Sequence, residues 1–148
     1  MQISQKCQYA LRAVFELALR ASDSPVKVGE IAEAQAIPPR FLEVILNQLK
    51  RGAFVESRRG TGGGYALARS PAELTMGEII RFIEGPFKPV SCLVGHSDER
   101  CPLYGGCVFL DVWEEAVKGM TDVFDRTTFQ ELVKRSKQKD PYVSSYTI

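Results

Sequence analysis

The first half of the chain alternates apolar and polar positions with the period of short amphipathic helices. Residues 4–21 are apolar on most sides, which predicts a largely buried helix behind an N-cap at Ser4. Its narrow polar stripe consists of Gln8, Arg12, Glu16 and Arg20. Two further helices are predicted near residues 29–34 and 38–51, with a tight turn between them. Because the second of these has a polar outer face, the pair indicates a helix-turn-helix unit.

The predicted helix of residues 38–51 has two different sides. The side chains expected to point into the core are Leu42, Ile45, Leu46 and Leu49. Those expected on the outer side are Arg40, Glu43, Asn47, Lys50 and Arg51. Strands are predicted at residues 54–57 and 65–68, and the glycine-rich run between them can adopt the positive φ angles of a hairpin turn. The expected fold class is therefore mostly α with a small β-hairpin wing, and residues 1–84 are expected to form a winged helix-turn-helix DNA-binding domain.

The second half of the chain predicts a long helix outside this domain. A capping box at Thr75 opens a helix that ends near residue 84, and residues 85–107 form a cysteine-rich loop. Residues 108–137 hold the long helix and a short C-terminal helix, and residues 138–148 form a polar tail. The apolar stripe of the long helix comprises Phe109, Val112, Trp113, Ala116, Val117, Met120, Val123 and Phe124. Because such a stripe outside a small domain usually packs against a second copy of itself, we expect a dimerisation helix and a homodimer.

Composition and charge are those of an ordinary soluble protein. The chain has 148 residues, of which 45% are hydrophobic and 25% charged, and its net charge is +1. No apolar run approaches the length of a membrane span, and the charged N-terminal segment lacks the features of a signal peptide. We therefore expect a cytoplasmic protein with no membrane partner. Residues 1–70 hold ten basic and six acidic side chains, whereas residues 71–148 hold nine and twelve, which favours the N-terminal half as the DNA-binding side.

Side chains of the second predicted helix and of the wing suit contacts with double-stranded DNA. The residues predicted to make them are Arg40, Glu43, Asn47, Lys50, Arg58, Arg59, Gly62 and Gly63. Arginine and lysine bind phosphates or guanines, glutamate accepts a hydrogen bond from cytosine, and asparagine pairs with adenine. The wing arginines suit the narrow minor groove, and the wing glycines let the backbone approach a ligand closely. The alternative interpretation is a set of solvated charges on a helical bundle. The glycine run lacks the ending of a phosphate-binding loop.

Three of the four cysteines lie close together, in the pattern Cys92-x8-Cys101-x5-Cys107. In a cytosolic protein such a group indicates metal binding or redox chemistry. The CxxC pairs of zinc sites are absent, whereas three thiolates in a glycine-containing loop can hold a 2Fe-2S or 4Fe-4S iron–sulfur cluster. Redox-active or incidental thiols and a structural zinc are the alternatives. Candidates for a fourth ligand are His96, Asp98, Glu99, Asp111 and, from a second subunit, Cys7.

Five segments together carry a family signature. They are Tyr9-Ala10-Leu11-Arg12, Val28-Gly29-Glu30-Ile31-Ala32, Phe41-Leu42-Glu43, Arg59-Gly60-Thr61-Gly62-Gly63-Gly64-Tyr65 and the three-cysteine loop. In these segments the chain resembles the Rrf-type bacterial winged-helix regulators, which include the iron–sulfur regulator IscR, the nitric-oxide sensor NsrR and the iron regulator RirA. The resemblance implies a homodimer crossed through the long helix, a cluster on the three cysteines, and DNA reading by Glu43 and Arg59.

The chain departs from that family at three points. Its first cysteine spacing is longer than the usual one, and Leu110 stands where some members carry a histidine ligand. Gln8 stands where other members supply an acidic ligand from the second subunit, so Gln8 joins the candidates for the fourth ligand.

The sequence therefore predicts a transcriptional regulator whose operator binding is controlled by an iron–sulfur cluster that senses redox, iron or nitric oxide status. One alternative is a regulator of the same fold that senses through bare cysteine thiols or a partner protein. Another is a cluster-binding interaction module that does not bind DNA. An enzyme is not expected, because the chain has one histidine, no nucleophile–base pattern and no fingerprint of an organic cofactor.

Overall fold

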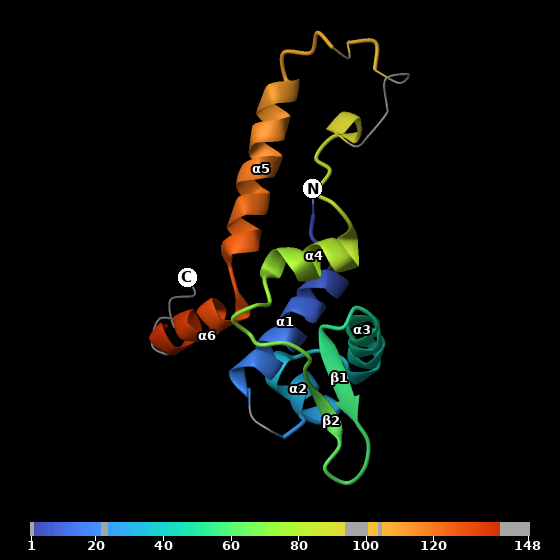
Figure 1. The fold of residues 1–148 in the computed structure, drawn as a ribbon. Helices are drawn as coiled ribbons and strands as arrows, with labels where there is room; N and C mark the ends of the chain where they lie inside the picture. Colours follow the sequence, from blue (N-terminus) through green and yellow to red (C-terminus); the bar gives the residue numbers. More distant parts are fainter. Residues whose placement is uncertain (1, 22–23, 94–100, 104, 140–148) are drawn as a thin grey trace, which may run out of the picture.

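The computed structural model describes residues 2–21, 24–93, 101–103 and 105–139. Within them the helices and strands form a winged body and one projecting arm (Figure 1). Their order is α1 (Gln5–Leu19), α2 (Val28–Gln35), α3 (Pro39–Arg51), β1 (Val55–Arg58), β2 (Gly64–Leu67), α4 (Met76–Glu84), the 3-10 helix η1 (Ser91–Leu93), α5 (Leu110–Arg126) and α6 (Phe129–Gln138). The expected fold class, mostly α with a small hairpin, is confirmed.

Helix α1 lies at the centre of the body and contacts α2, α3, α4 and α6. Its N-cap is Ser4, as predicted, and the Ser4 hydroxyl oxygen accepts a hydrogen bond from the backbone N–H of Cys7 at 3.1 Å. The largest fully buried side chains of the body are Phe129, Ile31, Leu42, Leu46, Leu49, Leu74, Ile79, Ile80, Val14, Val55 and Cys7. Close packing of these side chains around α1 supplies the main favourable term in the stability of the body.

The polar stripe expected on α1 is wrong at Glu16, whose side chain is buried, with 3% of the residue exposed. One carboxylate oxygen of Glu16 accepts a hydrogen bond from Arg20 Nε at 2.5 Å, and the other accepts one from Gln35 Nε2 at 2.7 Å. A buried carboxylate requires such partners. Glu16 therefore joins α1 to the end of α2 instead of facing solvent.

The turn between α2 and α3 has the geometry expected of a helix-turn-helix unit. Ala36 ends α2 in the left-handed conformation, with φ at 50°. The backbone N–H of Ile37 donates to the carbonyl oxygen of Ala32 at 2.9 Å, and Pro39 opens α3. The four leucine and isoleucine side chains predicted to point inward from α3 are all buried, so that prediction is confirmed.

The wing is a two-stranded antiparallel hairpin in which Val55 pairs with Leu67 and Arg58 pairs with Gly64. Both strands lie one residue closer to the turn than predicted, so the connecting loop has five residues, 59–63. The outer edge of β2 is bound to the body by two backbone hydrogen bonds of 2.8 Å between Val26 and Tyr65. A Cβ atom at Gly64 would overlap the carbonyl oxygen of Val26, so this close approach requires glycine.

Helix α5 forms the arm, which projects from the body opposite the wing (Figure 1), and none of its residues is buried. Its C-terminal end is attached to α4 by an ion pair of 2.6 Å between Arg81 and Asp125. The rings of Phe87 and Phe124 stack with their centroids 5.2 Å apart. The chain then returns to the body, where Phe129 of α6 is fully buried against α1.

Candidate nucleic-acid interface and cysteine segment

The outer side of α3 and the wing form one exposed surface. All the residues of α3 predicted to face outward are exposed, namely Arg40, Glu43, Asn47, Lys50 and Arg51. Within the residues that the structure describes, no carboxylate lies within ion-pair distance of Arg40 or Arg59. Cations without a local counter-ion attract phosphate more strongly than paired ones, because no internal contact must be broken.

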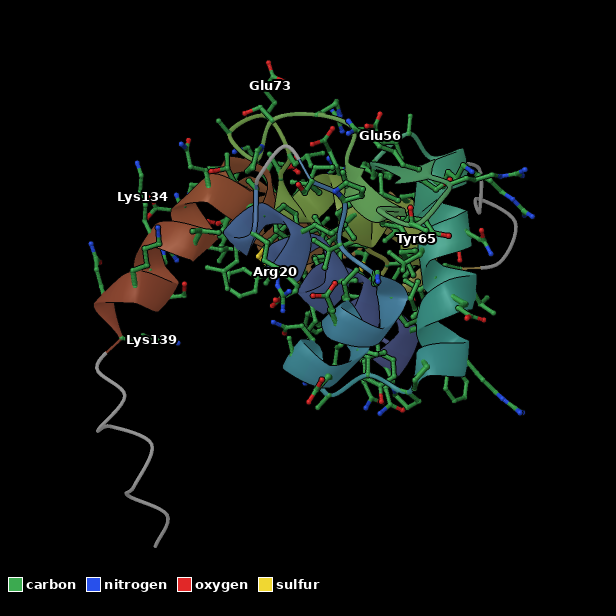
Figure 2. All side chains as sticks on the ribbon, turned by 90° about the horizontal axis from the view of Figure 1, so that it is seen from below. Arg20, Glu56, Tyr65, Glu73, Lys134 and Lys139 are labelled. Carbon is green, nitrogen blue, oxygen red and sulfur yellow. The ribbon has the colours of Figure 1, made fainter. Side chains whose placement is uncertain are left out.

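Two side chains of α3 are bound to the wing. The Lys50 ammonium donates a hydrogen bond to the Ser57 hydroxyl at 2.6 Å. The Tyr65 hydroxyl donates to the side-chain oxygen of Asn47 at 3.5 Å, which is a weak bond, and Tyr65 lies beside α3 in Figure 2. These contacts fix the wing relative to α3. Ser57 and Tyr65 were not among the residues predicted for this surface, because these contacts join segments that only the fold brings together.

The two wing arginines occupy different positions. Arg58 is the last residue of β1 and forms an ion pair of 3.3 Å with Glu56. Arg59 is the first residue of the loop and is exposed. Arg58 therefore does not lie in the turn of the wing with Arg59, because the strand pairing with Gly64 holds it inside β1.

The glycines of the wing loop have different structural requirements. A Cβ at Gly63 would lie 2.5 Å from the carbonyl oxygen of Arg58 and 2.8 Å from that of Gly60, so the turn itself excludes a side chain there. Gly60 has a φ of 108°, which favours glycine. At Gly62, by contrast, a Cβ would meet no atom within 4 Å and φ is not in the left-handed region. The fold of the protomer therefore gives no reason for glycine at position 62.

Two apolar side chains of this surface were missed as functional candidates. Phe41 is 64% exposed and Val44 is 63% exposed on α3. They line an apolar pocket of about 410 Å³ between α3 and the start of α1. The sequence carried a signal for them. They are apolar, they do not belong to the inward-facing set, and their spacing of three residues places them side by side on the helix.

The described cysteines of the loop all lie outside the body. Cys92 is in η1, which contacts α5, and Cys101 and Cys107 precede α5. All three are free thiols and half-buried. The backbone N–H of Leu110 donates to the carbonyl oxygen of Cys107 at 3.3 Å, so Cys107 belongs to the turn that starts the arm.

The donor chemistry of these thiols suits an iron–sulfur cluster, whose irons take cysteine ligands. Among the residues with described positions, however, no three cysteine, histidine or carboxylate side chains come together as a metal-binding group. His96, Asp98 and Glu99, three of the candidates for the fourth ligand, lie outside the described residues. The structure thus provides three partly accessible thiols in η1 and in the segment before α5.

The remaining ligand candidates differ in accessibility. Cys7 is fully buried, and burial, with a smaller effect of the Glu84 carboxylate, raises the pKa of its thiol to about 11. A buried, protonated thiol is a poor ligand, so this environment disfavours Cys7. Gln8 is exposed and donates from its side-chain nitrogen to the carbonyl oxygen of Ile3 at 3.2 Å. Asp111 is exposed in the first turn of α5.

A helix-turn-helix unit, a hairpin wing fixed to its second helix, and exposed arginines on their common surface define a class, the winged helix-turn-helix DNA-binding proteins. Residues 3–135 match the Rrf2 family, which is described as iron-dependent transcriptional regulators. The chain therefore belongs to the Rrf2 family. This is a family of transcriptional regulators, not of enzymes.

Known proteins of similar sequence and structure agree with this assignment. A helix-turn-helix transcriptional regulator of Mycobacterium tuberculosis strain H37Rv is 39% identical over 133 residues, which cover 89% of this chain and 81% of that protein. IscR of T. potens superposes with a TM-score of 0.76 at 30% identity, over 97% of this chain and 96% of that one. CymR, the global cysteine regulator of B. subtilis, gives a TM-score of 0.75 at 30% identity, over 95% and 99%. No helix in the described part of the chain is long and apolar enough to cross a membrane.

Proposed function

We propose that this Rrf2-family regulator is a cytoplasmic homodimer whose binding to operator DNA is controlled by an iron–sulfur cluster held by Cys92, Cys101 and Cys107. The observation that carries the proposal is the position of these thiols. They are free and partly accessible; Cys92 lies in η1, which contacts α5, and Cys101 and Cys107 precede α5, the helix that joins the cysteine segment to the winged body. The description of the family as iron-dependent supports the metal part of the proposal.

In the proposed complex α3 enters the major groove and the wing follows the DNA backbone. Arg40, Glu43, Asn47 and Lys50 are exposed on α3 and carry donors and acceptors that suit base edges and phosphates. The bonds from Lys50 to Ser57 and from Tyr65 to Asn47 keep the wing in register with α3. Arg59 supplies a cation, and the loop backbone at Gly62 and Gly63 approaches a phosphate.

The arm supplies the proposed dimer contact. Its exposed apolar residues include Phe109, Val112, Trp113 and Val123, and within the described part of the chain no other helix covers them. An exposed apolar stripe on a helix of 17 residues is suited to pairing with a second copy of itself. Pairing two arms would set the distance between two copies of α3, and hence the match to successive turns of a major groove.

Contacts between the cysteine segment, α4 and the arm provide the coupling. Phe87 lies between the end of α4 and Cys92 and stacks on Phe124 of α5, while Arg81 of α4 pairs with Asp125. A change at the cysteines that shifts α5 therefore acts on α4, which packs against α1. Regulation requires only that the cluster interact differently with the two arrangements of the arm.

A bound cluster would supply a centre that responds to oxygen, nitric oxide or iron supply, while the protein supplies thiolates and their position. The candidates for the fourth ligand are the exposed Gln8 and Asp111, and His96, which lies outside the described residues; burial disfavours Cys7. The test is the iron and acid-labile sulfide content of protein purified without oxygen, with its visible spectrum. We expect iron and sulfide in equal amounts, and their loss in a Cys92→Ser, Cys101→Ser, Cys107→Ser variant. A colourless, iron-free protein that binds operator DNA normally would refute the cluster.

A second candidate is control by the bare thiols of the same three cysteines. The observation that favours it is that the described residues do not gather three metal donors, although all three thiols are partly accessible. CymR of Staphylococcus aureus, a similar structure with a TM-score of 0.70 at 27% identity, is known in an oxidized form, which supports the same candidate. Reversible oxidation of iron-free protein, followed by mass spectrometry and operator binding, distinguishes the two. If oxidation of the thiols changes the operator affinity of metal-free protein, the protein is regulated through its bare thiols.

A further inference from the structure

Two apolar side chains, Phe41 and Val44, lie on the outer side of α3, whose other exposed side chains are mostly polar or charged. Val44 follows Arg40 by four residues and precedes Asn47 by three, so the three side chains share one face of the helix. Val44 is 63% exposed and the neighbouring Phe41 is 64% exposed, whereas the four core residues of α3 are buried on the other side. Neither side chain is needed to fill the core of the protomer.

The surface beside these residues is hollowed. Gln5, Lys6 and Tyr9 of α1 and Phe41, Val44 and Ile45 of α3 line the pocket of about 410 Å³, and most of its surface is apolar. Gln5 Nε2 donates a hydrogen bond to the Tyr9 hydroxyl at 2.9 Å, which holds one wall. The guanidinium of Arg12 lies over the Tyr9 ring, 5.9 Å from its centroid, so cationic groups border the pocket at Arg12 and Lys6.

An apolar floor with a cationic border is suited to a strand of DNA that carries thymine. The 5-methyl group of thymine is the apolar group that a base pair presents in the major groove, and phosphates of the same strand carry the negative charge. The pocket is continuous with the surface of α3 that carries Arg40 and Asn47. That continuity favours DNA over a protein partner as the occupant.

We propose that Phe41 and Val44 determine operator specificity by binding the methyl group of thymine, while Lys6 and Arg12 bind phosphates of the same strand. This inference rests on the proposed binding of duplex DNA and adds the base that one part of the surface recognises. It also gives the start of α1 a role in DNA contact that its sequence did not indicate.

The experiment begins with full-length protein and a random duplex library, from which a preferred operator is selected. Each thymine of that operator is then replaced in turn by deoxyuridine, which removes one methyl group and leaves every hydrogen bond unchanged. Binding is measured by fluorescence anisotropy for the wild type, Phe41→Ala, Val44→Ala and Leu19→Ala. Leu19 is an exposed apolar residue at the other end of α1, so its variant is the matched control.

For the wild type we expect one or two positions in each half-site at which loss of the methyl group weakens binding about fourfold, the size expected for one methyl group returned to water. Val44→Ala or Phe41→Ala should bind the thymine operator more weakly by a similar factor, and deoxyuridine at that position should weaken their binding no further. For Leu19→Ala, deoxyuridine should weaken binding as it does for the wild type. Because all three positions are exposed, we expect the alanine variants to fold, and thermal unfolding checks this.

Two results would overturn the inference while leaving DNA binding intact. One is an affinity that is indifferent to deoxyuridine at every position, and the other is an unchanged methyl penalty in both α3 variants. If Val44→Ala instead alters dimerisation or capture of a protein and not DNA affinity, the pocket has another occupant. A wild-type protein that selects no duplex at all would remove the proposed function itself.

Discussion

At the scale of single residues, neighbouring side chains of the wing differ in what they are free to do. Arg58 is held in β1 beside Glu56, whereas Arg59 is exposed in the loop and has no acidic partner among the described residues. Gly63 is required by the turn, whereas Gly62 is not. The fold of the protomer does not explain Arg59 or Gly62, so contact with DNA is the physical reason that we propose for both.

Replacement of Arg59 by alanine is predicted to weaken operator binding and to reduce its dependence on salt. A lost phosphate contact lowers the slope of log affinity against log salt concentration by about one. Arg135→Ala is the control, because Arg135 is an exposed arginine of α6 in an ion pair with Glu131. Titrations at several salt concentrations measure the slope, and an Arg59→Ala slope equal to that of the control would exclude Arg59 from the contact.

Alanine at Gly62 and at Gly63 is predicted to have opposite effects. Gly62→Ala should leave the free energy of unfolding unchanged and weaken DNA binding, because the new methyl group meets only the approaching phosphate. Gly63→Ala should lower the free energy of unfolding by roughly 1–3 kcal/mol, because its Cβ meets two backbone carbonyl oxygens. Urea unfolding and operator binding measure the two effects. Equal stability losses in both variants would contradict this assignment.

The buried thiol of Cys7 predicts a specific loss of stability at alkaline pH. Its pKa is raised from 9.0 to about 11 in the folded protein, so the unfolded chain releases this proton at lower pH than the folded one. The contribution of Cys7 is therefore complete below about pH 9 and is lost as the pH rises toward 11. Urea unfolding at a series of pH values should show the difference in free energy of unfolding between the wild type and Cys7→Ala falling over this pH range. A difference independent of pH would contradict burial of Cys7.

At the scale of elements, the junction between α4 and α5 is where the proposed signal would pass from the arm to the body. Gly77 of α4 is buried, and a Cβ there would overlap a carboxylate oxygen of Asp125, which pairs with Arg81. The absence of a side chain at Gly77 thus permits α5 to lie against α4 in this arrangement.

Gly77→Ala is predicted to lower the free energy of unfolding by roughly 1–3 kcal/mol, because the new methyl group displaces Asp125. Asp125→Ala alone should cost about 0–1 kcal/mol, since it removes only an exposed ion pair. The double variant should be close to Asp125→Ala, because the space for the methyl group is restored. Denaturant unfolding of the three variants measures this coupling, and purely additive losses would show that Asp125 is not what the methyl group meets.

Local patterns in the sequence predicted most of these elements, and the exceptions have a common physical origin. The N-cap at Ser4, the capping box at Thr75 and the inward face of α3 depend on residues three or four positions apart, so they can be identified from the sequence. Burial of Glu16 depends instead on Gln35 from another helix, and the strand ends depend on Val26. Contacts between distant segments decide such details, and periodicity carries no information about them.

At the scale of the whole molecule, the body carries the proposed DNA surface, and the arm α5 joins it to the segment that carries the three thiols. The last helix, α6, closes the body by burying Phe129. The C-terminal end of α5 is attached to α4 by a hydrogen bond of 2.9 Å from the backbone N–H of Met76 to the carbonyl oxygen of Thr127, the C-cap of α5. Both ends of α5 are therefore tied, one to the body and one to the cysteine segment. The proposed control of DNA binding requires that a displacement at the cysteine segment reach the body along this helix.

The most direct test of the central claim is the ratio of operator affinities before and after the signal, in the wild type and in the Cys92→Ser, Cys101→Ser, Cys107→Ser variant. Operator binding is measured without oxygen and again after exposure to oxygen or nitric oxide. The wild-type affinity is predicted to change by about 5- to 150-fold, the usual range of coupling between two sites, and the variant's affinity to stay constant. An equal change in both proteins, or none in the wild type, would contradict control of DNA binding by these cysteines.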